Sequence, residues 1–202
     1  IMENSYYSNL GVPYSSPAPI VNGTTDKNVI FAPHAYDFMV DTPSYKYANN
    51  ERIKAIFDEH KRSQERLNVP VIVGEWGGFT DGNEWFHHIK FLLELFDRNH
   101  WSQTYWSYFR GITESELFKD VLIRPYPVAV TGKIIEYSYN RESNSFSLEY
   151  AQDKEFDEPT QIFLHKKISA VEADGEYEIK NSILNLRTKP GNHKIKIVFE
   201  QE

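Results

Sequence analysis

The chain has 202 residues, of which 40% are hydrophobic and 25% are charged. This composition is typical of a globular protein and excludes a disordered chain, a collagen-like repeat and a coiled coil. The net charge of −7 argues against a nucleic-acid partner, because that affinity comes largely from Lys and Arg that neutralise phosphates. The length suits one large domain or two small ones, but it falls short of the roughly 250 residues of a complete α/β barrel.

Three further features of the sequence narrow the class. It has no cysteine, which excludes disulfides and thiolate metal sites. No run approaches the roughly 20 consecutive apolar residues that span a bilayer, so we expect no membrane span. The chain opens with Ile-Met-Glu, and residues 1–22 lack the basic start and apolar run of a signal peptide. We therefore expect an interior segment of a longer protein.

The region up to residue 75 predicts a loop, two strands and a helix. Residues 5–25 are rich in Ser, Tyr, Pro, Gly and Asn and indicate a long loop. A short buried strand is expected over 28–33, and a helix follows that is capped by Asn49 or Asn50. Residues 71–75 are apolar on both faces, as in strands of a parallel sheet. The apolar stripe of the helix consists of Ile53, Ile56, Phe57, His60 and Leu67.

The alternation of strand and helix continues beyond this point. After a Gly-rich loop, a second helix is expected to run to about Asn99, and a third strand to span 102–109. Strands and helices joined by tight connections are typical of βα units and a parallel sheet. Thr113 and Glu116 fit a capping box for a short helix through about Val121.

The pattern changes after Arg124-Pro-Tyr-Pro127. From Gly132 onward, apolar residues recur with period two between turn residues, which favours a small antiparallel β-sandwich. We therefore expect two domains, 1–125 and 126–202. The predicted strands of the second are Ile134–Tyr139, Ser145–Tyr150, Thr160–His165, Glu176–Lys180, Ile183–Thr188 and Lys194–Phe199.

Chemically useful side chains follow three strands of the first domain. His34 and Tyr36 share a face if their strand extends that far. Glu75 is in phase with Val71 and Val73, and Trp106, on the third strand, is in phase with Thr104 and Tyr108. Because sites of parallel sheets form at the C-terminal strand ends, we expect these residues to converge. A carboxylate can attack an anomeric carbon, a Tyr hydroxyl can keep it ionised, and Trp can stack on a sugar.

Four motifs, in this order, resemble glycoside hydrolase family 5. Ala32-Pro-His-Ala-Tyr36 is similar to the family's His-x-Tyr, and Val71-Ile-Val-Gly-Glu-Trp-Gly77 resembles its nucleophile strand. Tyr105-Trp-Ser-Tyr108 resembles the end of its last strand. Ile123-Arg-Pro-Tyr-Pro-Val-Ala-Val-Thr-Gly132, which leads into a β domain, is similar to endoglycoceramidases and their relatives. Together these motifs extend the resemblance over nearly the whole chain.

The resemblance implies a fold and a set of roles. The fold would be α/β, the C-terminal half of a TIM (β/α)₈ barrel, about strands 5 to 8, followed by a small antiparallel β-sandwich; residues 2–4 would end strand 5. Glu75 would be the nucleophile of a retaining glycosidase, and Tyr36 would hydrogen-bond and orient it. His34 would contact sugar or nucleophile, and Trp106 would form the floor of the subsite where the bond breaks.

The sequence departs from the family at the second carboxylic acid. A retaining glycosidase needs an acid about 5–5.5 Å from the nucleophile, and the family carries it in an Asn-Glu-Pro-like motif at the fourth strand. No such motif occurs here; Asn83-Glu84 comes after Glu75 and is followed by Trp85. We therefore expect the chain alone to be inactive. Its partner would be an N-terminal half of the same enzyme, present as a separate chain or a missing region.

The resulting hypothesis is a retaining endo-β-glycosidase that acts on a glycan or glycolipid substrate, such as a glycosphingolipid. Hydrolysis of a β-glucan or of a steryl glucoside stays open within the family, since nothing in these residues separates a lipid aglycone from a sugar. A different class, a non-catalytic carbohydrate-binding protein, also stays open. The family resemblance favours a secreted or extracellular location, with the signal region in the missing N-terminal part.

Structural interpretations compete with the functional ones. Glu75 could be a structural carboxylate paired with Arg or with the backbone. Trp85 and Trp101 are best interpreted as packing residues. His87 and His88 would point about 100° apart on a helix, so they cannot chelate one metal together. We expect neither a metal site nor a cofactor.

Overall fold

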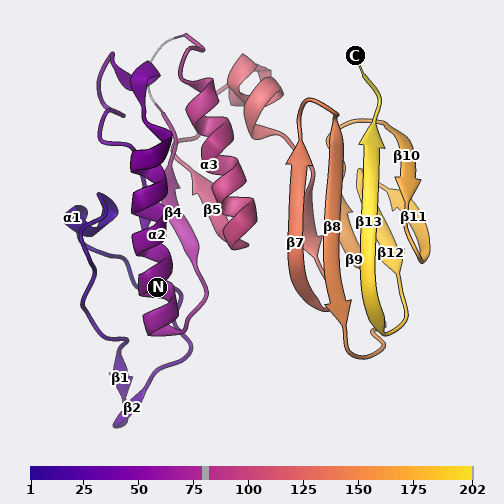
Figure 1. Ribbon diagram of the computed structural model, residues 1–202, viewed down its shortest axis with the longest axis horizontal. Helices are drawn as coiled ribbons and strands as arrows, with labels where there is room; N and C mark the ends of the chain where they lie inside the picture. The colour runs from indigo at the N-terminus through magenta and orange to yellow at the C-terminus, as the bar shows by residue number, and fades with distance from the viewer. Residues whose placement is uncertain (79–81, 202) are drawn as a thin grey trace. The chain divides into compact units, whose positions relative to one another are not determined.

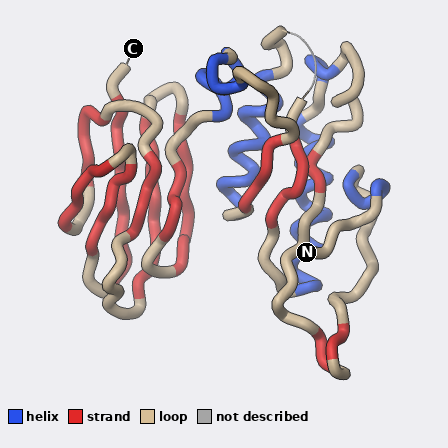
Figure 2. Tube along the Cα trace, turned by 180° about the vertical axis from the view of Figure 1, so that it is seen from behind, coloured by secondary structure: helices blue, strands red, loops and turns tan. Residues whose placement is uncertain are grey.

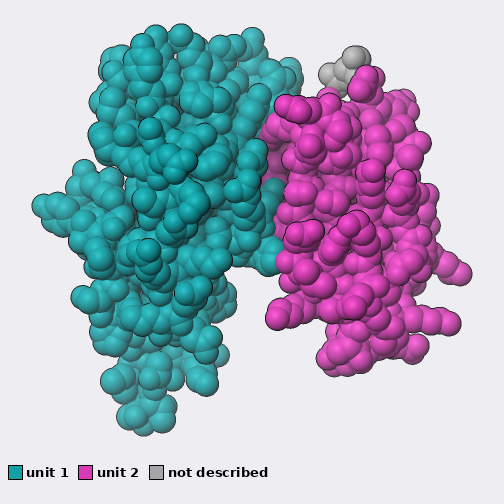
Figure 3. Space-filling model, in the orientation of Figure 1, with its two compact units in different colours: residues 1–121 teal, residues 122–202 magenta. Residues whose placement is uncertain are grey.

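The computed structural model describes residues 1–78 and 82–201. They form two compact units, Ile1–Val121 and Leu122–Glu202, to which Figure 3 gives different colours. The first unit mixes helices with parallel strands, and the second consists of antiparallel strands. Among the described residues, no helix is both long and apolar enough to span a bilayer.

The sheet of the first unit is parallel, as the βα pattern predicts. Its strands are ordered β3-β4-β5, and isolated parallel bridges join Met2 to Phe31 and Phe31 to Val71. The segment around Met2 therefore lies beside the chain that leads into β3 and extends the parallel order. The strands are β3 (His34–Ala35), β4 (Ile72–Trp76) and β5 (Ser102–Tyr105).

Two helices cover one face of this sheet (Figure 1). Helix α2 (Asn50–Leu67) begins where predicted: the Asn49 side chain accepts a hydrogen bond from the Arg52 N–H at 2.9 Å and so satisfies a free donor of the first turn. Helix α3 (Phe86–Asn99) ends at the predicted residue. In Figure 2, no helix of the described residues lies over the opposite face of the sheet.

The core of the first unit lies between the two helices and the sheet. The predicted stripe of α2 is buried throughout, His60 included. Phe57 stacks on Trp101 with ring centroids 5.5 Å apart, and Trp76 packs edge-on against Phe96 at 4.9 Å. Trp85 is buried as well, so the packing interpretation of Trp85 and Trp101 agrees with the structure.

The loop prediction for residues 5–25 is wrong in part. A short helix, α1 (Tyr6–Asn9), begins after Ser5, and the strands β1 (Ile20–Val21) and β2 (Thr24–Thr25) form a hairpin. Asn22 and Gly23 take positive φ at its tip. A two-residue Asn-Gly connection between strands is a signal for a β-hairpin, so this hairpin could have been predicted from the sequence.

Other boundaries differ from the predictions. The strand expected over 28–33 is reduced to the bridge at Phe31, and β5 ends at Tyr105 rather than at residue 109. The capping box of Thr113 and Glu116 is wrong, because Ser115 accepts the hydrogen bond, from the Phe118 N–H. Short 3₁₀ helices span Tyr45–Tyr47 and Ile112–Glu114, and a π-helical segment spans Leu117–Leu122.

The second unit is the predicted sandwich, with two four-stranded antiparallel sheets ordered β10-β13-β8-β7 and β11-β12-β9-β6. Residues of both sheets fill its core, including Phe146, Leu148, Ile162, Leu186 and Ile197. Strands β6 and β10 were not predicted from the sequence. The strands are β6 (Tyr126–Ala129), β7 (Lys133–Asn140), β8 (Ser145–Gln152), β9 (Thr160–Phe163), β10 (Ile168–Glu172), β11 (Glu176–Lys180), β12 (Ile183–Arg187) and β13 (Gly191–Phe199).

Candidate active site

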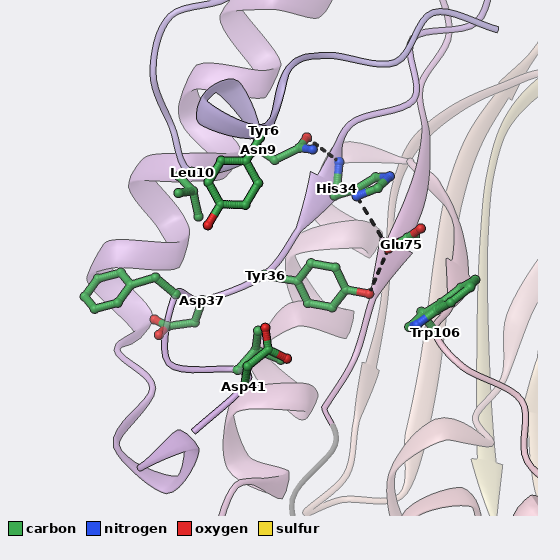
Figure 4. Close-up of a pocket in the computed structure, with 11 residues that line it drawn as sticks. Tyr6, Asn9, Leu10, His34, Tyr36, Asp37, Asp41, Glu75 and Trp106 are labelled. Atoms are coloured by element: carbon green, nitrogen blue, oxygen red, sulfur yellow. Dashed lines mark hydrogen bonds and ion pairs between the residues drawn. The ribbon is translucent and has the colours of Figure 1, made fainter. Parts of the chain in front are cut away.

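A pocket of about 410 Å³ opens where β3 and β4 end. All four residues that the sequence singled out lie on its wall, and Figure 4 shows Tyr36, His34 and Glu75 pointing toward one another. The residues that line it are Tyr6, Asn9, Leu10, His34, Tyr36, Asp37, Phe38, Val40, Asp41, Glu75 and Trp106.

Glu75 stands on β4, opposite His34 in the parallel ladder. Its phase with Val71 and Val73 predicts a shared face, yet those two residues are buried and the Glu75 side chain is 33% exposed. The pairing of β4 with β5 shifts register between Val73 and Trp76. Irregularities of this kind re-aim a side chain and are common beside active sites. Here the shift turns Glu75 out of the buried row and into the pocket.

Tyr36 holds one oxygen of this carboxylate. Its hydroxyl donates to Glu75 Oε2 at 3.4 Å. Burial, followed by the negative charge of Glu75, raises the pKa of Tyr36 well above its usual value. The hydroxyl therefore stays protonated at neutral pH, as a donor must.

His34 contacts the same oxygen from another side. Its Nδ1 lies 3.5 Å from Glu75 Oε2, and its Nε2 lies 3.0 Å from Glu3 Oε1. The His34 ring stands perpendicular to that of Tyr36, with centroids 6.3 Å apart. Two polar side chains therefore lie within 3.5 Å of one carboxylate oxygen.

The backbone of His34 is fixed on both sides. Its N–H donates to Asn9 Oδ1 at 2.8 Å, and its carbonyl oxygen lies 3.0 Å from His60 Nε2. Burial lowers the pKa of His60 to about 4, so that imidazole is neutral at pH 7. Because a carbonyl can only accept, Nε2 of His60 carries its proton. His60, a buried histidine of α2, thus helps to fix the backbone of His34 at the site.

Asp37 ties down the loop that follows Tyr36. It is fully buried, and Arg52 donates to both of its oxygens, from Nε at 2.9 Å and from Nη2 at 2.7 Å. Burial alone would raise the pKa of Asp37, but the hydrogen bonds of Arg52 and of backbone N–H groups outweigh it and lower the pKa. This ion pair joins residues fifteen positions apart, and no sequence motif pointed to it.

Trp106 forms another part of the pocket wall and is 50% exposed. It lies just beyond β5, where its backbone N–H donates to the Trp76 carbonyl at 2.8 Å. An exposed indole face held at a pocket wall can stack on a sugar ring. Where the sequence left open a structural carboxylate paired with Arg or with the backbone, Glu75 contacts the side chains of Tyr36 and His34.

Asn9 and Asp41, which line the pocket, and Glu3, which contacts His34, were not predicted as site residues. Glu3 and Asn9 lie in or beside a segment interpreted as a loop. Long-range pairing brings that segment to the site: Met2 bridges to Phe31, and Asn9 Oδ1 accepts from the His34 N–H. Within residues 1–78 and 82–201, no three His, Asp or Glu side chains gather as a metal site would require.

Comparison with known structures finds chains of similar fold. Endoglycoceramidase II from Rhodococcus sp., in complex with a five-membered iminocyclitol, is similar in fold, with a TM-score of 0.80 and 23% identity over 98% of this chain. Sterylglucosidase 1 from Cryptococcus neoformans matches with a TM-score of 0.70 and 13% identity over 92% of this chain. The chain spans 50% and 40% of the lengths of these two structures.

Family models give the more specific result. Residues 1–110 match the model of cellulase (glycosyl hydrolase family 5), and residues 124–198 match that of the glycoside hydrolase family 5 C-terminal domain. No match was found among curated proteins. The two models together account for both units, and the chain therefore belongs to glycoside hydrolase family 5.

Proposed function

We propose that this chain supplies the nucleophile half of a retaining endo-β-glycosidase. One observation carries the proposal: the Tyr36 hydroxyl donates to one oxygen of Glu75, with His34 Nδ1 at 3.5 Å from the same oxygen, within a pocket that an exposed Trp106 also lines. Such a carboxylate is oriented and partly open to solvent, as a nucleophile toward an anomeric carbon must be.

The reaction would proceed by double displacement. One Glu75 oxygen attacks the anomeric carbon while the bond to the aglycone oxygen breaks, and a second carboxylic acid gives its proton to that leaving oxygen. Water then attacks the same carbon, gives a proton back to the second carboxylate and releases Glu75. Tyr36 would hold the other oxygen throughout, His34 would contact the sugar or the nucleophile, and Trp106 would stack on the sugar.

The acid would come from an N-terminal half of the same enzyme, either a separate chain or a region outside this one. Among the described pocket residues, Asp37 is unsuited because Arg52 keeps it ionised. The parallel order of Met2, β3, β4 and β5 is what strands 5 to 8 of a TIM barrel would give. The similar endoglycoceramidase structure is about twice as long as this chain. The chain alone would then be inactive.

The substrate we favour is a glycosphingolipid or a related glycolipid. The likeness to endoglycoceramidase II supports this choice, because both units of the chain are included in it. A steryl glucoside is the alternative suggested by the likeness to the sterylglucosidase, and a β-glucan is the alternative suggested by the cellulase model. Release of sugar from lactosylceramide, cholesteryl glucoside and cellotetraose by the assembled enzyme would rank the three.

Covalent trapping tests the nucleophile assignment. We expect the enzyme assembled with its N-terminal half to form a stable ester with a 2-deoxy-2-fluoro glycosyl fluoride, and the label to lie on the peptide that contains Glu75. Glu84→Gln is the matched control, since Glu84 is an exposed carboxylate that pairs with Lys46; its labelling should equal that of wild type. A label on another residue would contradict the assignment.

The same reagent separates the enzyme from a non-catalytic carbohydrate-binding protein. Such a protein would bind the glycan in a titration but would take no covalent label. Glycan binding without any label on the assembled protein would therefore favour this second candidate.

A further inference from the structure

The Glu3 carboxylate belongs to the site although no motif includes it. We infer that Glu3 is a positioning residue that holds the His34 imidazole in the orientation in which Nδ1 faces Glu75. The inference deepens the proposed function and rests on it for its catalytic consequence. Its structural basis is the row of contacts that runs from Glu3 through both nitrogens of His34 to Glu75.

Strand pairing fixes the position of Glu3. The preceding residue, Met2, donates its N–H to the Ile30 carbonyl at 2.7 Å and accepts from the Ala32 N–H at 2.7 Å. These bonds pin the backbone beside the segment that leads to His34. The side chain of Glu3 is 61% exposed, but the backbone beneath it is held by the parallel ladder.

His34 has few remaining degrees of freedom. Asn9 and His60 bind its backbone N–H and carbonyl groups, so the main motion left to the side chain is rotation of the ring. A flip of the ring would exchange Nδ1 with a carbon atom on the side of Glu75. The contact from Nε2 to Glu3, at 3.0 Å, is shorter than the contact from Nδ1 to Glu75, at 3.5 Å, and it opposes that flip.

The proton arrangement follows from the acceptor. A carboxylate accepts hydrogen bonds and does not donate them, so a His34 ring with its proton on Nε2 is the form that can donate to Glu3 across this 3.0 Å contact. Nδ1 is then the nitrogen that faces Glu75, and it can donate to that carboxylate whenever the ring holds a second proton. Glu3 therefore acts on the nucleophile through His34, without touching the substrate itself.

Two variants separate this role from a merely structural one. Glu3→Ala removes the acceptor, whereas Glu3→Gln keeps an acceptor oxygen of the same reach. Glu65→Ala, on the exposed surface of α2, is the control. The first readout is the exchange rate with water of the His34 Nε2–H in ¹⁵N-histidine-labelled chain, assigned by its loss in His34→Gln. The second is the rate at which the assembled enzyme is labelled by the fluoro glycoside.

We expect Glu3→Ala to speed the exchange of the Nε2–H and to slow the labelling by about three- to fivefold, the scale of a partly exposed pair. In Glu3→Gln, the exchange rate and the labelling rate should both be close to those of wild type. Glu65→Ala should change neither rate. Unchanged exchange in Glu3→Ala overturns the inference. If wild type takes no label at all, the glycosidase proposal fails, and the exchange rates still decide whether Glu3 holds His34.

Discussion

The two units differ in how completely their buried polar atoms are hydrogen-bonded. In the sandwich, a buried polar network is closed: the Thr131 hydroxyl contacts both Thr160 and Gln152 within 3.0 Å. In the α/β unit, Asn4 and His88 carry buried polar atoms without a hydrogen-bond partner in the described part of the chain. Unsatisfied buried groups cost stability. The unit that bears the site is thus the less completely satisfied one, which is typical of functional regions.

The largest expected effect concerns activity in the first unit. Glu75→Gln should lower the turnover of the assembled enzyme by about 10⁴-fold or more, because the amide cannot form the glycosyl ester. Its thermal transition should stay close to that of wild type, since Glu75 is partly exposed. Steady-state kinetics and calorimetry on the same preparation check this. If Glu75→Gln instead lowered the thermal transition together with the turnover, the loss of activity would reflect unfolding and not the missing nucleophile.

The next effect concerns the core of the second unit. Phe146 is fully buried in the sandwich, and Phe146→Ala should destabilise this unit by about 3–5 kcal/mol through lost burial and a residual cavity. All four tryptophans, Trp76, Trp85, Trp101 and Trp106, lie in the first unit. Hydrogen exchange along β8 should rise, whereas the tryptophan fluorescence transition should stay in place. A matching shift of that transition would mean that the units unfold together.

Acidification should weaken the first unit. Burial lowers the pKa of both His60 and His88 to about 4, from an ordinary value of 6.5. The unfolded chain therefore binds protons below pH 6.5 that the folded chain does not, so stability is fully present above pH 6.5 and falls as the pH drops toward 4. The loss should be on the order of 1–3 kcal/mol per histidine, measured by tryptophan fluorescence in urea between pH 7 and 4.

A variant series assigns this pH dependence. His60→Gln should flatten the decline, whereas His87→Gln, at an exposed position of α3, should leave it unchanged. Equal slopes for wild type and His60→Gln would show that the buried imidazole is not responsible.

The smallest expected effect is local. Asn49→Ala removes the side-chain cap on the Arg52 N–H and should destabilise the first unit by about 1 kcal/mol. Asn50→Ala is the control, because Asn50 lies inside the helix and provides no such cap. Urea unfolding followed by fluorescence compares the two. If Asn50→Ala lowered the free energy of unfolding more than Asn49→Ala, the assignment of Asn49 as the N-cap would be wrong.

Much of the fold could be predicted from sequence because its signals are local. The start of α2 follows from Asn49 and the stripe that ends at Leu67, and most sandwich strands follow from period-two alternation. The missed strands lack that signal. Strand β6 contains Pro127 and lies at a sheet edge, where proline is tolerated, and β10 has no buried residue and so no alternation to detect.

Only the site residues that lie within sequence motifs could be predicted. His34, Tyr36, Glu75 and Trp106 converge because strand order brings their strand ends together. The turn of Glu75 into the pocket depends on a register shift with β5, which is a pairing between distant segments. Glu3 and Arg52 reach the site through tertiary contacts alone, and no spacing in the sequence encodes those contacts.

Azide rescue of Glu75→Ala in the assembled enzyme tests the central claim most directly. With an activated β-glycoside as substrate, the small anion can occupy the space of the deleted carboxylate and attack the anomeric carbon from the same face. Our account predicts restored turnover and an α-glycosyl azide as product, with Glu84→Ala unaffected by azide. A β-glycosyl azide, or no rescue in a folded variant, would contradict the assignment of Glu75 as the nucleophile.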